Sequence, residues 1–107
     1  MALTTNTQTG SQVRNQVVGS VVTDASAAAA ATFTVGFNPR IVRFHNLTDR
    51  ISDEWYEGMA SASSLHTVAA GTRTLETVNG IAVSANGFTV TATTMVASKT
   101  YAWEAIG

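Results

Sequence analysis

Apolar and polar residues alternate with a two-residue period over short stretches of this chain. Residues 32–37 read Thr-Phe-Thr-Val-Gly-Phe, with the apolar side chains on odd positions, and residues 88–93 read Phe-Thr-Val-Thr-Ala-Thr, with them on even positions. Successive side chains of a β-strand point to opposite faces, so this alternation indicates strands with one face in a core. Both stretches are therefore predicted to be half-buried strands.

Two more strands are predicted from the same pattern. Residues 40–47 place Val42 and Phe44 on one face. Residues 99–106 form an aromatic strand with Tyr101, Trp103 and Ala105 on one side. Nearer the N-terminus, residues 13–23 hold five valines and one glycine, Gly19, which favours a kinked strand because β-branched residues lose rotamer freedom in a helix.

Two stretches leave alternatives open. Residues 25–31 are rich in alanine, which favours helix, but seven residues are too few to hold a helix without packing. In residues 51–57, the four-residue spacing of Ile51, Trp55 and Met59 would suit a helical stripe. We favour a strand for residues 51–57, because Gly58 closes the segment after so few residues.

Turn signals separate the strands. Asn79-Gly80, between two apolar residues, predicts a type I′ hairpin turn, since these residues adopt positive φ at little steric cost. Asn86-Gly87 repeats the signal. Asn38 followed by proline marks another turn.

These elements predict an all-β fold. With a loop at residues 61–64 and short strands at residues 65–68 and 72–78, the count reaches about seven or eight short antiparallel strands, at the spacing typical of a sandwich or barrel. We expect a single jelly-roll-like β-sandwich or barrel over residues 13–107. The polar, uncharged residues 1–12 are expected to form a flexible, extended N-terminal arm.

The core available to this fold is thin. Hydrophobic residues make up 45% of the chain, but 17 of them are alanine. Leu, Ile, Val and Phe form about 22% of the residues, close to the level below which chains tend to stay disordered. The formal net charge of −1 argues against disorder. We therefore expect a homo-oligomer, with a trimer favoured, in which neighbouring subunits cover each other's apolar surface.

Composition also bears on partners. The six basic residues are scattered, which argues against nucleic acid. The absence of cysteine excludes disulfides and thiolate metal sites. No apolar run is long enough to cross a bilayer, and the first ten residues lack the pattern of a signal peptide. We expect synthesis in the cytoplasm, no membrane partner and no cofactor.

Candidate catalytic and metal-binding groups are few. The carboxylates of Asp49, Asp53, Glu54 and Glu57 lack the spacing of a calcium loop, and a solvated turn and strand face is predicted for them. His66 and Asp53 could be drawn into a triad with a serine at position 52 or 64, but no G-x-S-x-G motif is present. With His45 the chain has only two histidines, so zinc would need a carboxylate as a third protein ligand. We expect no catalytic or metal-binding residues, and we expect that the protein is not an enzyme.

Two groups of residues carry a family resemblance. The first comprises residues 36–42, Asn46 and residues 55–59. The second comprises residues 71–74, 79–81, 87–90 and 101–103. Over about residues 36–103 the chain resembles small structural proteins of tailed bacteriophages that are encoded near the major capsid protein, including head decoration, or cement, proteins.

This resemblance implies a virion structural protein that binds the major capsid protein on the capsid exterior and stabilises the shell. Its partner-binding residues are expected in the arm and in an aromatic pair, namely Thr4, Thr5, Asn6, Thr7, Gln8, Trp55 and Tyr56. The alternative is a phage tail or fibre component with a carbohydrate- or receptor-binding β-sandwich. Tryptophan and tyrosine could stack on sugars in such a protein, although packing is the favoured role of these aromatics.

Overall fold

The computed structural model describes residues 15–107, which form eight β-strands in one antiparallel sheet. The strands are β1 (Gln16–Val22), β2 (Ala31–Thr34), β3 (Ile41–Asn46), β4 (Ile51–Tyr56), β5 (Ser63–Thr67), β6 (Arg73–Val83), β7 (Gly87–Val90) and β8 (Thr100–Ile106). The prediction of an all-β fold with seven or eight antiparallel strands is confirmed. Residues 51–57 form a strand rather than a helix, and strand β5 begins two residues inside the predicted loop.

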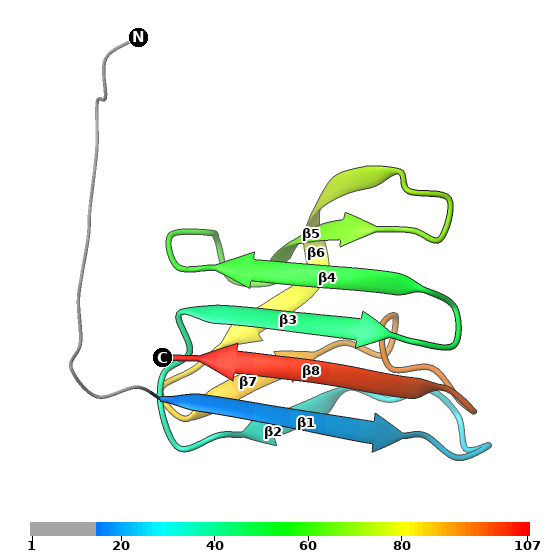
Figure 1. Cartoon of the computed structure of the whole chain (residues 1–107), viewed down its shortest axis with the longest axis horizontal. Coiled ribbons are helices and arrows are strands. Elements are labelled where there is room, and N and C mark those ends of the chain that lie inside the picture. The colour runs from blue at the N-terminus through cyan, green and yellow to red at the C-terminus, as the bar shows by residue number, and fades with distance from the viewer. Residues whose placement is uncertain (1–14) are drawn as a thin grey trace, which may run out of the picture.

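The sheet curls into an open half-barrel. Its strand order is β1-β8-β3-β4-β5-β6-β7-β2, so β1 and β2 are the two edge strands. Figure 1 shows β1, β8, β3 and β4 in front, with β7 and β2 behind them. The core lies between these two layers.

Nine apolar residues are buried in this core: Val42, Phe44, Trp55, Ile81, Phe88, Val90, Met95, Tyr101 and Ala105. Aromatic rings join the layers. The ring of Phe33 in β2 stacks on that of Phe88 at a centroid distance of 5.0 Å, and lies 5.4 Å from that of Trp103 in β8. The predicted faces of β3 and β8 both point inward, as the alternation indicated.

The predicted hairpin turn at Asn79-Gly80 is wrong. Both residues lie inside β6, and neither has the positive φ that a type I′ turn requires. The register instead shifts at this point, because Ser63 pairs with Ile81 whereas the next residue, Ser64, pairs with Glu76. Residues 77–80 therefore bulge out of the ladder, and such bulges bend a strand.

The backbone of this bulge is satisfied locally. Glu76 Oε2 accepts hydrogen bonds from the N–H groups of Thr77, Val78 and Asn79 at 3.0, 3.1 and 3.3 Å. The bonds from Val78 and then Asn79 hold the pKa of the Glu76 carboxyl below its ordinary value. Gly80 N–H donates to the Ala62 carbonyl at 2.9 Å. One carboxylate thus supports the bend that carries β6 from the front layer to the back.

The second Asn-Gly pair also takes a different role from the predicted one. A hairpin does join β6 to β7, but its tip is Ala85 and Asn86, flanked by Ser84 and Gly87. Neither tip residue has positive φ. Gly87 opens β7, where an added Cβ would lie 1.9 Å from the Phe33 carbonyl oxygen, so glycine is required there for close approach of β2.

Candidate interaction surface

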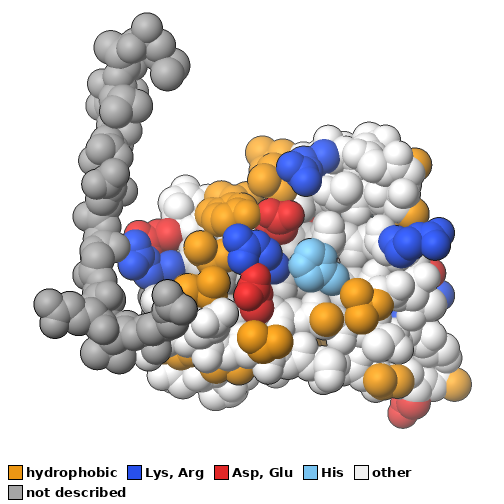
Figure 2. Space-filling model, in the orientation of Figure 1, with side chains coloured by type: hydrophobic (Ala, Val, Ile, Leu, Met, Phe, Trp, Pro, Cys, Tyr) orange, Lys and Arg blue, Asp and Glu red, His pale blue; other side chains and the backbone are white. Residues whose placement is uncertain are grey.

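The outward side of β1, β8, β3 and β4 carries a row of charged residues between apolar ones. Strand register aligns Glu54, Arg43, Glu104 and Val18 across these four strands. Arg43 donates a hydrogen bond to the Glu104 carboxylate, which raises the pKa of its guanidinium. Figure 2 shows hydrophobic, basic and acidic side chains interspersed on this side of the molecule.

Tyr56 lies beside this charged row and contacts two of its residues. Its hydroxyl donates to Glu54 Oε2 at 2.6 Å, and the Arg43 guanidinium carbon lies 6.0 Å from the centre of its ring. Tyr56 also borders an open groove of about 380 Å³, lined in addition by Arg40, Ile41, Glu57, Ile106 and Gly107. An aromatic ring beside paired charges can contact a protein or a polar ligand.

The predicted partner residues Trp55 and Tyr56 point to opposite faces of β4. Trp55 is only 6% exposed and belongs to the core, where its Nε1 donates to the Ala60 carbonyl at 3.3 Å. Trp55 is therefore buried in the core, and of this predicted pair Tyr56 is the residue that reaches the surface. Tyr56 is partly exposed. The arm residues of the set, Thr4, Thr5, Asn6, Thr7 and Gln8, lie outside the described residues.

Exposed valines continue this side onto the edge strand. Val18 and Val22 of β1 are 71% and 76% exposed, and Leu47 is 55% exposed. Leu47 N–H donates to the carbonyl of Thr100, the residue that pairs with Val22. Val22 and Leu47 therefore lie near the Thr100 end of β8, and Val18 lies further along the strand opposite Glu104, all three with most of their surface in solvent.

Asp53 departs from the predicted solvated carboxylate face, because it is only 3% exposed. It is held by two polar partners, since its Oδ1 lies 2.7 Å from Ser64 Oγ and 2.9 Å from His66 Nδ1. In a catalytic triad the histidine lies between the serine and the acid. Here the acid lies between the other two, so the histidine does not contact the serine that it would activate.

A small pocket of about 260 Å³ opens beside this cluster, with Asp53, His66, Asp49 and Glu76 in its wall. Within residues 15–107, no group of three or more histidine, cysteine or acidic side chains is arranged to hold a metal ion. The hydrogen bonds of this cluster join Asp53 of β4 to Ser64 and His66 of β5.

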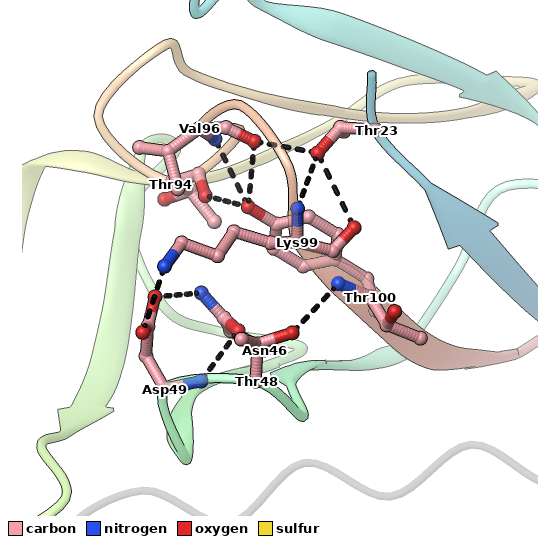
Figure 3. A network of polar contacts seen from close by, with 9 residues as sticks. Thr23, Asn46, Thr48, Asp49, Thr94, Val96, Lys99 and Thr100 are labelled. Carbon is pink, nitrogen blue, oxygen red and sulfur yellow. Dashed lines mark hydrogen bonds and ion pairs between the residues drawn. The ribbon is translucent and has the colours of Figure 1, made fainter. Parts of the chain in front are cut away.

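A polar network lies where the C-terminal end of β1 meets the N-terminal end of β8 (Figure 3). Lys99 Nζ donates to Asp49 Oδ1 at 3.0 Å, which lowers the pKa of the Asp49 carboxyl. The fully buried Tyr101 donates its hydroxyl to the Thr94 carbonyl at 2.9 Å and accepts from Val96 N–H at 2.9 Å. Thr23 N–H donates to the Lys99 carbonyl at 2.9 Å. The Thr23–Lys99 bond continues the pairing of β1 with β8 beyond Val22.

Sequence reasoning missed the Arg43–Glu104 pair and the edge position of β1. The alternation around Arg43 did indicate that its side chain points outward. Its partner is 61 residues away in the chain, so only the β3–β8 pairing brings the two together.

No helix in residues 15–107 is long and apolar enough to cross a membrane. Comparison with known proteins finds no matching family, no matching curated protein and no matching solved structure.

Proposed function

We propose that this protein is a virion structural subunit that binds the outer surface of a phage capsid and stabilises the shell. The observation that carries the proposal is the outward side of β1, β8, β3 and β4, which combines Tyr56, the Arg43–Glu104 pair and exposed valines on one rigid sheet. Aromatic and arginine side chains amid apolar surface are enriched where proteins bind proteins. The resemblance to decoration proteins supplies the identity of the partner, the major capsid protein.

The thin core supports the same proposal. Nine buried apolar residues hold a sheet of eight strands, while Val18 and Val22 are left in solvent. Burial of such side chains against a partner is favourable, at about 25 cal/mol per Å² of apolar surface removed from water. A shell subunit gains this burial when it binds its lattice. Tyr56 and the uncharged arm residues are the contacts proposed for this binding.

One observation favours the tail or fibre alternative. Tyr56 borders a groove with Arg40 and Glu57, whose side chains pair at 3.0 Å. An aromatic ring beside hydrogen-bonding groups suits a carbohydrate. Heat resistance of heads and adsorption to the host separate the capsid function from the tail or fibre function.

Capsids that lack the protein should release DNA at a lower temperature, and purified protein should restore their resistance. A protein that binds only the intact shell stabilises it by mass action. Tyr56→Ala should restore less, because it removes the exposed ring. Val78→Ala is the matched control and should restore fully, since this valine is 69% exposed on β6. The measurement is DNA release on heating, with circular dichroism to confirm that each variant is folded.

Equal heat resistance of heads with and without the protein would contradict the proposal. Loss of host adsorption in the same particles would then favour the tail or fibre function.

A further inference from the structure

The outer edge of β1 carries backbone groups without a partner in the described part of the chain. Thr23 N–H donates to Lys99, and Gly107 N–H donates to the Asn15 carbonyl, so odd-numbered residues of this strand face β8. In an antiparallel ladder the N–H and C=O groups of alternate residues point to opposite sides. The groups that point away from β8 belong to Gln16, Val18, Ser20 and Val22.

This edge also lacks the features that normally protect one. Natural edge strands are short, charged, bulged or interrupted by proline, because unpaired N–H and C=O groups attract another strand. Strand β1 reads Gln-Val-Val-Gly-Ser-Val-Val, with no charge and no proline, and it pairs with β8 without a register shift. The other edge strand, β2, has only four residues. Val35 N–H donates to the Asn86 carbonyl, so the odd-numbered residues of β2 face β7. The backbone groups that point away from β7 belong to Thr32 and Thr34.

We propose that β1 is a self-association strand, and that a second copy of this chain pairs with it antiparallel about a two-fold axis at Gly19. In this register Gln16 lies opposite Val22 of the second copy, and Val18 lies opposite Ser20. Each of the four outward residues then exchanges both of its hydrogen bonds, so every free backbone group on the edge is satisfied. The two front layers become one continuous sheet.

The charges beside the edge favour a second copy as the occupant. Among the β8 residues that pair with β1, Glu104 is the charged one, and it lies opposite Val18. In the proposed pair, Val18 lies opposite Ser20 of the second copy, and that serine pairs with Ala102 of the same copy. Glu104 therefore faces no like charge across the axis. Two-fold pairs are also the commonest symmetric assemblies, and they require a surface that is complementary to itself. The inference does not rest on the proposed function.

Ser20→Pro tests the pairing at its centre. The Ser20 N–H points away from β8, so proline removes no bond within the sheet, and proline is tolerated in edge strands in this orientation. It removes an outward donor and places its ring in the way of a second strand. The matched control is Thr32→Pro, which removes an N–H that points away from β7, together with the exposed hydroxyl contact between Thr32 and Thr89. Light scattering of the full chain at about 50 µM should give two subunits for the unchanged protein and for Thr32→Pro. Ser20→Pro should weaken the association by at least about tenfold and give one subunit.

A second experiment determines the register of the β1–β1 pair by disulfide cross-linking. The chain has no cysteine of its own, so only the introduced residues can form a disulfide. Val18→Cys and Ser20→Cys, mixed and oxidised, should give a disulfide-linked pair in higher yield than either variant alone, because opposite residues at these positions have Cα atoms about 5.5 Å apart.

Several results would overturn the proposal. A monomer at this concentration would show that the edge is unpaired or is covered within the chain. A mass of three subunits would support the trimer expected from the sequence, which equivalent pairing of β1 with β1 cannot form. Dissociation by Thr32→Pro but not by Ser20→Pro would assign the contact to β2.

Discussion

Gly80→Ala is expected to destabilise the protein by about 3 kcal/mol, because the position has no room for a methyl group. An added Cβ would lie 2.3 Å from the Ser63 carbonyl carbon, 2.5 Å from its oxygen and 2.7 Å from the Ala62 oxygen. All three are backbone atoms, so no side chain can rotate to make space. Moving them would break the Gly80 N–H bond to Ala62, which helps to hold the bulge. The melting temperature should fall by about 15 °C.

Gly36→Ala is the matched control. Gly36 has a φ of 87°, but an added Cβ would meet no atom within 4 Å. Its cost should be limited to backbone strain, on the order of 1 kcal/mol. A smaller loss for Gly80→Ala than for Gly36→Ala would contradict the steric account of the bulge.

Phe88→Ala is expected to cost about 3–5 kcal/mol, the range typical of buried phenylalanine. Phe88 is fully buried, and its ring lies 5.0 Å from that of Phe33, 5.3 Å from that of Trp103 and 6.3 Å from that of Phe44. It therefore joins both layers. Small domains are stable by only about 5–15 kcal/mol, so removal of this one ring should cost the protein much of its stability.

Urea denaturation measures this loss. Val78→Ala, at a valine that is 69% exposed, should shift the free energy of unfolding by less than about 0.5 kcal/mol. If Phe88→Ala cost no more than Val78→Ala, the two-layer core would not be the source of stability.

The strands of this fold could be predicted because their burial alternates with a period of two. Phe88 and Val90 are both buried while Thr89 between them is not, and the same holds for Val42 and Phe44 around Arg43. Pairing of distant strands could not be predicted in this way. Nothing in the local sequence of β3 specifies that it lies between β4 and β8.

The bulge in β6 misled local reasoning for a physical reason. Asn-Gly favours a hairpin turn through its backbone freedom, and this preference competes with tertiary contacts. Here the Glu76 carboxylate and the Ala62 carbonyl accept the backbone N–H groups of residues 77–80. With these groups satisfied, the strand continues to Val83.

The interaction surface was only partly predictable. Alternation indicates that neighbours such as Trp55 and Tyr56 point to opposite faces, but it does not say which face is the core. Trp55 lies on the inward side of the curled sheet, where it is 6% exposed. The free edge of β1 depends on strand order, which is a property of the whole fold.

If the proposed function is right, a tailed phage carries this sequence, and electron microscopy of purified virions of that phage tests the central claim most directly. We expect density on the outside of the capsid that fits the eight-stranded domain, with Tyr56 facing the shell. This density should be missing from particles made without the protein. Density for the domain only in the tail or fibres, or in no part of the virion, would contradict the account.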